Sequence, residues 1–288
     1  MTDRDAAGLR GPVVRCRTET TWWVRNAAGE MEENSSTAVT EYDSEGNIPG
    51  LEKRRRNEER SYVNGRLVTI FRVPEEVRER AVGFTAFAVE GLEGCGCPDT
   101  TAEVRTTWNQ RSLPVETVFL DNKGRTLSRV RRVRDKAGRL VEQHQFLTAR
   151  ASRALYMAWK AVVNAGRRQR GPLRISSRFY KYDDTGRRAE VRTVSPPVME
   201  QVERFEYNDH GDPIRHTTEH VGREAGLDEH GQLQTRDEQR RIDETRTDYL
   251  YDALGNWTER IQYVRAAPGE EYQRVMRERR ALEYAADA

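Results

Sequence analysis

Histidine is the residue type in this sequence that most directly suggests chemistry, because imidazole nitrogen is the commonest protein ligand for transition metals. Four of the five histidines lie in one segment, at His210, His216, His220 and His230. On a helix, the four-residue spacing of His216 and His220 would form a good ligand pair. One interpretation is therefore a metal-dependent hydrolase that uses the His210–His230 segment.

The same spacing on β-strands argues against chelation. Four residues of strand span about 13 Å, so His216 and His220 would share a face but could not share a metal ion. His210 and His230 each precede a glycine in consecutive repeats and would lie roughly 10 Å apart, whereas metal–nitrogen bonds are about 2 Å long. We therefore interpret the histidines as exposed turn and strand residues, and we predict no metal ion and no cofactor.

The other reactive residue types give weaker signals. Cys95 and Cys97 could bind a soft metal or form a strained disulfide, but no second pair accompanies them and Cys16 stands alone. The sequence has no Gly-x-Ser-x-Gly nucleophile motif, no His-Glu-x-x-His motif and no phosphate loop. We interpret the cysteines as incidental or structural, nominate no catalytic residue, and predict that the protein is not an enzyme.

Composition narrows the class further. Apolar residues make up 36% and charged residues 33% of the 288 positions, a polar balance that suits a thin or elongated fold. The net charge is only +2, which argues against a dedicated nucleic-acid binder. A protein that binds nucleic acid mainly through its arginines stays as an alternative function. No apolar stretch is long enough to span a membrane. Residues 1–5 lack the order of a secretory signal, so we expect a cytoplasmic protein if this N-terminus is native, or a secreted or periplasmic one if a signal peptide was removed.

One short pattern, Asp or Asn followed by two free positions and Gly, recurs along the chain. An Asp or Asn that begins a turn can accept a hydrogen bond from the backbone two residues later. The Gly supplies the left-handed residue that closes a type I turn and joins two antiparallel strands. We therefore predict β-hairpins with positive φ at the glycines. The copies are Asp5–Gly8, Asn26–Gly29, Asp43–Gly46, Asp121–Gly124, Asp135–Gly138, Asp183–Gly186, Asn208–Gly211, Asp228–Gly231 and Asp252–Gly255.

Alternating side chains beside these turns predict strands. Tyr182, Tyr207 and Tyr251 stand directly before a turn, and an aromatic residue two positions earlier shares the face of each. After the last turn, the alternation from Trp257 to Tyr263 separates a mostly apolar face from a polar one. Exposed aromatic and arginine side chains are frequent interface anchors. The candidate partner surface consists of Tyr182, Tyr207, Tyr251, Trp257, Arg167, Arg168 and Arg170.

Three segments resemble the YD repeats of the RHS family: Tyr-Lys-Tyr-Asp-Asp-Thr-Gly-Arg (180–187), Phe-Glu-Tyr-Asn-Asp-His-Gly-Asp (205–212) and Tyr-Leu-Tyr-Asp-Ala-Leu-Gly-Asn-Trp (249–257). With its closing Arg-Ala-Leu-Glu-Tyr (280–284), the last is similar to the terminal unit of small bacterial RHS-like proteins. The resemblance implies a long antiparallel sheet that can curl into a shell or spiral, generally outside the cytoplasm, for which carbohydrate or cargo binding is often proposed. Residues 47–51 only weakly echo the family's Asp-Pro-x-Gly-Leu cleavage motif, so no toxin or autoprotease function is implied.

Two stretches interrupt the repeats. Residues 146–166 predict an inserted amphipathic helix at about 148–165, which Thr148 can cap and Gly166 can end. Its apolar stripe, which includes Leu155 and Val162, would pack on the sheet or bind a partner. The basic run at Arg167, Arg168 and Arg170 follows it. Residues 72–100 form an irregular insertion that begins with a short helix near Pro74.

The segment Tyr272–Tyr284 tests the whole interpretation. Local propensity favours a helix, because the segment is rich in good helix formers. Its acidic residues also come first and its arginines later, which suits the helix dipole. A strand at Trp257–Tyr263 would, however, leave a long edge that needs covering, and residues 266–269 offer a turn that folds the tail back onto it. We therefore predict a strand.

The fold class that follows is mainly β, with repeated antiparallel β-hairpins forming a long curled sheet and one inserted helix. We expect N-terminal hairpins over 1–145, the helix and basic loop over 146–172, and C-terminal YD-like hairpins over 173–288, as one continuous repeat domain. The predicted function is a non-catalytic binding or structural module that presents a β-sheet surface to a glycan or protein partner. The sequence predicts no oligomeric state.

Overall fold

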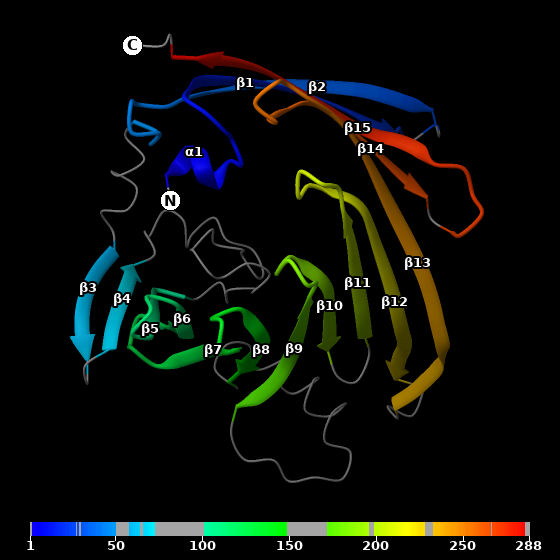
Figure 1. Ribbon diagram of the computed structural model, residues 1–288. Coiled ribbons are helices and arrows are strands. Elements are labelled where there is room, and N and C mark those ends of the chain that lie inside the picture. Colours follow the sequence, from blue (N-terminus) through cyan, green and yellow to red (C-terminus); the bar gives the residue numbers. More distant parts are fainter. Residues whose placement is uncertain are drawn as a thin grey trace. The chain divides into compact units, whose positions relative to one another are not determined.

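The computed structural model describes residues 2–26, 28, 30–49, 58–63, 66–72, 101–148, 172–195, 199–227, 233–265 and 267–285. Within these ranges the chain forms one short helix, α1 (Asp3–Ala6), and fifteen strands (Figure 1). The strands are β1 (Val13–Arg25), β2 (Met31–Glu41), β3 (Glu58–Val63), β4 (Arg66–Arg72), β5 (Glu103–Trp108), β6 (Pro114–Leu120), β7 (Thr126–Arg134), β8 (Leu140–Leu147), β9 (Leu173–Tyr182), β10 (Arg188–Ser195), β11 (Met199–Tyr207), β12 (Pro213–Leu227), β13 (Leu233–Tyr251), β14 (Trp257–Arg265) and β15 (Gln273–Tyr284).

The strands form one sheet in the order β2-β1-β15-β14-β13-β12-β11-β10-β9-β8-β7-β6-β5-β4-β3. Nearly every strand neighbours the strand next to it in sequence, so the sheet is built from successive hairpins. The exception is the pair β2 and β3, which stand at the two ends of this order, since β1 pairs antiparallel with β2 on one side and with β15 on the other. The predicted mainly-β fold of repeated antiparallel hairpins is therefore confirmed. None of the described helices has the length and hydropathy of a membrane span.

Backbone contacts divide the chain into two compact units. Unit 1 contains residues 1–55, 203–219 and 241–288, and unit 2 contains residues 56–202 and 220–240. Unit 1 therefore holds β1, β2, β14 and β15 together with the turn ends of β11, β12 and β13. The division into segments 1–145, 146–172 and 173–288 stays a prediction.

The Asp183–Gly186 turn shows how the recurring pattern works. Asp183 N–H donates to the carbonyl of Arg187 over 2.8 Å, and Gly186 N–H donates back to the Asp183 carbonyl over 3.0 Å. The Asp183 carboxylate accepts backbone bonds from Thr185 and Arg187 and a side-chain bond from the Arg187 guanidinium. Gly186 has φ +86°, and positive φ also occurs at Gly46, Gly124, Gly138, Gly211 and Gly255, which confirms the hairpin prediction at these copies. Gly29 and Gly231 lie outside the described residues.

Two turns differ from the prediction. At Asp5–Gly8 the pattern ends helix α1 instead of joining strands, because the Asp5 carboxylate turns back to the backbone of Thr2 in a capping box. Conversely, Asn109–Ser112 is a hairpin turn of the same kind without a glycine. Ser112 has φ +55°, and Asn109 makes the same backbone bonds to Arg111 and Leu113 as the aspartates make elsewhere.

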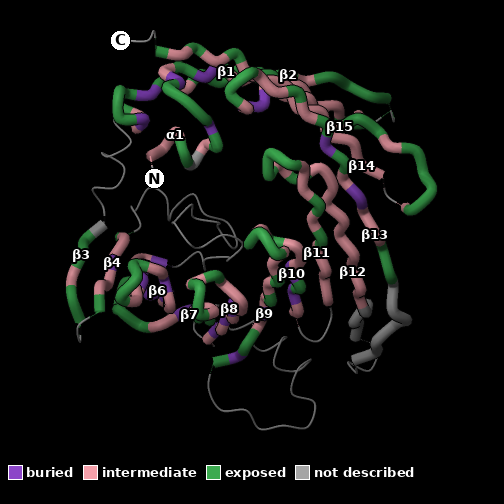
Figure 2. The backbone as a smooth tube through the Cα atoms, in the orientation of Figure 1, coloured by how far each residue is buried: buried purple, intermediate pink, exposed green. Residues whose placement is uncertain are grey.

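Each unit has buried residues of its own (Figure 2), many of them apolar. In unit 1, Leu9, Val13, Cys16 and Tyr42 form a cluster against which Leu282 and Tyr284 of β15 pack. In unit 2 the buried apolar residues include Val104, Phe119, Leu127, Val130, Leu147, Leu173 and Val191. Burial here combines apolar side chains with hydrogen-bonded polar ones, since Thr106 and Thr117 bond each other at 3.2 Å in the interior.

The C-terminal segment is strand β15, as predicted. It pairs with β14 and with β1, so it covers both edges that would otherwise be open. The preceding turn contains Gly269 with φ +93°. Burial does not alternate between the predicted apolar and polar faces of β14. Trp257 is buried and every later position is half-buried. Glu259, on the face predicted to be mostly apolar, forms ion pairs with Arg277 and Arg279 of β15.

The predicted helix at about 148–165 falls almost entirely on residues 149–171, which lie outside the described part of the chain, as do the insertion at 73–100 with Cys95 and Cys97. Phe146 and Leu147 begin the stretch that was expected to contain the helix, but they belong to strand β8. Thr148 follows that strand, and its hydroxyl donates to the carbonyls of Thr126 and Leu127.

Candidate binding cavity

The aromatic residues of the candidate partner surface occupy different environments. The Tyr182 hydroxyl, in unit 2, donates to the Leu140 carbonyl at 2.7 Å, and the Arg139 guanidinium lies over its ring. Trp257 is only 8% exposed, between the guanidinium groups of Arg260 and Arg280, so its ring does not offer a surface anchor. Tyr207 ends β11 and is half-buried. Tyr251 lines a cavity, and Arg167, Arg168 and Arg170 lie outside the described residues.

Two of the described histidines stack on aromatic rings. His210 stacks on Tyr251 with ring centres 4.0 Å apart, and His216 stacks on Phe205 at 4.6 Å. His216 Nε2 also lies 3.3 Å from the carboxylate of Glu203. His220 lies on β12, and His230 is outside the described part of the chain. Among the residues that the structure describes, no three metal-ligating side chains gather in one place.

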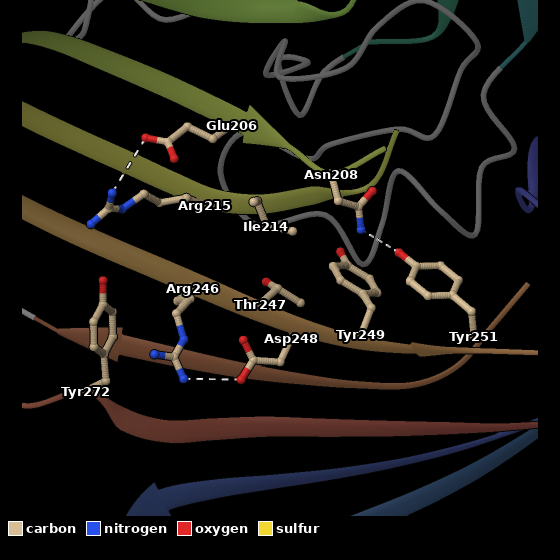
Figure 3. Close-up of a pocket in the computed structure, with 10 residues that line it drawn as sticks. All are labelled: Glu206, Asn208, Ile214, Arg215, Arg246, Thr247, Asp248, Tyr249, Tyr251 and Tyr272. Carbon is tan, nitrogen blue, oxygen red and sulfur yellow. Dashed lines mark hydrogen bonds and ion pairs between the residues drawn. The ribbon is translucent and has the colours of Figure 1, made fainter. Parts of the chain in front are cut away.

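A cavity of about 570 Å³ lies in unit 1 (Figure 3). The hairpin of β11 and β12 forms one side, β13 forms the other, and Tyr272 before β15 closes one end. Adjacent residues of β13 line the cavity and belong to opposite faces of the strand, so β13 contributes side chains from both of its faces. The lining residues are Glu206, Asn208, Ile214, Arg215, Arg246, Thr247, Asp248, Tyr249, Tyr251 and Tyr272.

Tyr249 and Tyr251 form an aromatic wall of the cavity. They alternate along β13 onto one face, with ring centres 5.9 Å apart, and both point toward the β11–β12 turn (Figure 3). The Tyr249 hydroxyl donates to the Pro213 carbonyl over 3.2 Å. The Tyr251 hydroxyl donates to Asp212 and accepts from the Asn208 amide, both over 2.7 Å. These bonds hold the two rings against the turn.

The protonation state of Tyr251 is fixed by the same environment. Burial raises the pKa of its phenol, and the hydrogen bond to the Asp212 carboxylate raises it further, to about 12. The phenol therefore remains neutral at physiological pH and keeps its donor directed at Asp212. The hydrogen bond from Tyr251 to Asp212 therefore persists at physiological pH and keeps the Tyr251 ring in place.

Glu244 holds together the side chains at the end of the cavity that Tyr272 closes. Its carboxylate is 9% exposed and accepts hydrogen bonds from Arg215, from the Tyr272 hydroxyl and from Arg265, the last at 2.6 and 3.0 Å. Burial raises the pKa of Glu244, but the bonds from Tyr272, Arg265 and Arg215 together outweigh burial and hold the pKa at about 2. The carboxylate therefore stays ionised and fixes the side chains that line the cavity.

The charges that line the cavity balance one another. Arg215 lies 3.6 Å from Glu206 as well as bonding Glu244, and Arg246 bonds Asp248 at 3.2 Å. Arg246 also lies over the Tyr272 ring, 5.2 Å from its centre. Since two arginines face two acids in the lining, the cavity carries no net charge. It offers tyrosine ring faces together with guanidinium, carboxylate and amide groups that can donate or accept hydrogen bonds.

The sequence indicated only part of this site. Of the lining residues, only Tyr251 belongs to the candidate partner surface, because it directly precedes a turn; Tyr249 is expected to share its strand face but is not a predicted site residue. Glu244, Arg215 and Tyr272 come from three separate segments and show no local spacing that would connect them. A signal for them exists only in the strand register, which places β12, β13 and the residues before β15 beside one another.

No family model matches the chain, and no curated protein matches it. Among solved structures it is similar to a porin-like protein from Bacteroides uniformis, with 10% sequence identity and a TM-score of 0.36. The similarity covers 95% of this chain and 98% of that one.

Proposed function

We propose that the protein is a non-catalytic binding module whose cavity holds a neutral saccharide unit of a glycan. The observation that carries the proposal is a cavity with three tyrosines and no net charge. The apolar faces of a sugar ring pack well on aromatic rings, and sugar hydroxyls need donors and acceptors held in fixed directions. Tyrosine rings, the Asn208 amide and the paired charges of Arg246 and Asp248 supply these features together.

The size of the cavity fits this class of ligand. Small-molecule sites have volumes of about 300–1,000 Å³ and combine apolar walls with a few placed polar groups. A cavity of about 570 Å³ falls within that range. The resemblance to YD repeats, for which carbohydrate binding is often proposed, agrees with the same ligand class.

A binding role fits the carboxylate chemistry better than a hydrolytic one. Glycoside hydrolysis requires a carboxylic acid whose pKa is raised so that it can protonate the leaving group. The pKa of Glu244 is shifted the opposite way, to about 2, because three hydrogen-bond donors hold it as a carboxylate. This residue is therefore suited to positioning Arg215 and Tyr272, and it would be a poor proton donor.

Binding can be tested by titrating the full chain with neutral oligosaccharides and with uronic acid oligosaccharides of equal length, using calorimetry. We expect neutral ligands to bind and the variant Tyr249→Leu, which loses the ring but keeps apolar volume, to weaken binding about five- to tenfold. Tyr62→Leu is the matched control, because Tyr62 is 78% exposed and lies in unit 2. Stronger binding of the acidic series, or no binding across the neutral panel, would overturn the proposal.

A further inference from the structure

The outer edge of β2 is a long row of backbone groups that no described strand covers. β2 pairs with β1 along eleven consecutive positions, from Arg15↔Glu41 to Arg25↔Met31, with no shift in register. On its other side β2 ends the strand order of the sheet. An uncovered edge of this length is a template for one more strand.

The register shows which backbone groups point outward. Tyr42 N–H donates to the Val14 carbonyl at 2.9 Å, and Asn26 N–H donates to the Glu30 carbonyl at 2.8 Å, at the two ends of the hairpin. In an antiparallel pair, hydrogen-bonded positions alternate with positions that do not bond across that pair. Even-numbered residues of β2 therefore bond to β1. The odd-numbered residues, Met31, Glu33, Ser35, Thr37, Val39 and Glu41, direct their N–H and C=O groups to the outside.

This edge lacks the features that normally block edge pairing. Proteins protect edges with short strands, prolines, lysines or bulges. β2 has none of these: it is eleven residues long, contains neither proline nor lysine, and has a continuous register. Its central residues, Ser35 to Val39, are small or β-branched and carry no charge. The charged residues of β2 are all glutamates near its two ends.

We propose that a second copy of this chain pairs with β2 through its own β2, antiparallel and centred on Ser36. In this register all eleven residues are paired and no glutamate faces another, because Glu33 lies opposite Val39 and Glu32 opposite Thr40. A shift that centres the pair on Thr37 would place Glu33 opposite Glu41, and like charges directly opposite are destabilising. Charge and length therefore select one two-fold register. β2 contributes no residue to the saccharide cavity, so this inference stands independently of it.

Proline substitution at an outward position tests the pairing. Thr37→Pro removes an outward N–H without removing a bond to β1. Thr37→Ala is the matched control, since it changes the side chain but keeps the N–H. By sedimentation velocity over a range of concentrations, we expect dimers for wild type and Thr37→Ala, and a dimer at least about tenfold weaker for Thr37→Pro. A monomeric wild type, larger open assemblies, or an unchanged Thr37→Pro dimer would overturn the proposal.

A cross-link tests the register even if the proline variant does not fold. Ser36 meets its own copy at the two-fold axis as a pair without backbone bonds, where Cα atoms lie about 4.5 Å apart, within disulfide reach. Ser36→Cys should therefore form a covalent dimer under mild oxidation, beyond any formed by the wild-type cysteines. Asn34→Cys faces Ala38 in this register and should cross-link far less. Equal cross-linking of the two variants would contradict the register, and the absence of any Ser36→Cys dimer would contradict the interface.

Discussion

Removing the charge of Glu244 should destabilise unit 1 in a pH-dependent way. Glu244→Gln keeps the size of the side chain but places an amide among donors from Arg215, Arg265 and Tyr272. One face of that amide is itself a donor, so at least one of these bonds is lost and two guanidinium groups lose their shared counter-charge.

The magnitude follows from the pKa. A fall from 4.5 to about 2 corresponds to an upper bound of about 3 kcal/mol of stabilisation. The side chains of Arg215 and Arg265 are 43% and 20% exposed, so solvent screens part of this interaction. We therefore expect Glu244→Gln to lower the free energy of unfolding by about 2 kcal/mol at pH 7.

The sign of the pH dependence is set by the lowered pKa. A carboxylate with a lowered pKa in the folded state stabilises the protein above the unfolded-state pKa of about 4.5, and that stability is lost as pH falls toward 2. The difference between wild type and variant should therefore be constant from pH 7 to pH 5.5 and shrink to about 1 kcal/mol at pH 3. Taking the difference at each pH cancels the titration of the other carboxylates.

The assay is urea denaturation followed by tryptophan fluorescence at pH 7, 5.5 and 3. Glu41→Gln is the matched control, because Glu41 is 72% exposed and only 3.9 Å from Arg15, and its change should stay below about 0.5 kcal/mol. The reasoning is refuted if Glu244→Gln costs no more than Glu41→Gln at pH 7, or if its cost is the same at pH 3 as at pH 7.

Two further substitutions test the turns and the buried polar contacts. Gly186→Val should cost about 1–3 kcal/mol, because φ is +86° and open space surrounds the site, so backbone strain acts without a clash; Gly186→Asn should cost much less, and equal costs in denaturant melts would argue against strain as the cause. Asn256→Ala should cost about 2–3 kcal/mol, because its 1% exposed amide bonds the backbone of Arg10 and the hydroxyl of Tyr284. Asn256→Asp keeps the acceptor for the Arg10 N–H and should lie between Asn256→Ala and wild type in thermal melts, whereas a cost below about 0.5 kcal/mol for both variants would mean that these bonds contribute little.

The turns were predictable because their physics is local. An Asp carboxylate bonds the backbone within the next four residues, as at Asp183, and a glycine at the left-handed position completes the loop. Asn109–Ser112 does not match the pattern because a serine stands at the positive-φ position, held by the same asparagine bonds. At Asp5–Gly8 the hairpin prediction is wrong, because the same four-residue pattern can close a short helix when a threonine caps it.

The strand β15 shows that topology can outweigh propensity. Its arginines and glutamates favour a helix in isolation, but as a strand they form cross-strand ion pairs, such as Arg277 with Glu259 and Arg260 with Glu278. The cavity was less accessible to sequence reasoning. Glu244 and Tyr272 meet only through the register of β13, β14 and the turn before β15, and no short-range spacing records that register.

The pairing of β1 with β15 has a consequence for the order in which the protein folds. Arg15 of β1 bonds Glu283 of β15 across 268 positions of sequence, whereas β5 to β8 each pair with the strand made just before. During synthesis the hairpins of unit 2 can form as they leave the ribosome. The hairpin of β1 and β2 can also form early, but β1 gains its second neighbour only when β15 has been made. An interrupted chain that lacks β15 leaves both β1 and β14 with an open edge, the kind of surface that aggregates. Unit 1 can therefore be completed only after β15 has been synthesised.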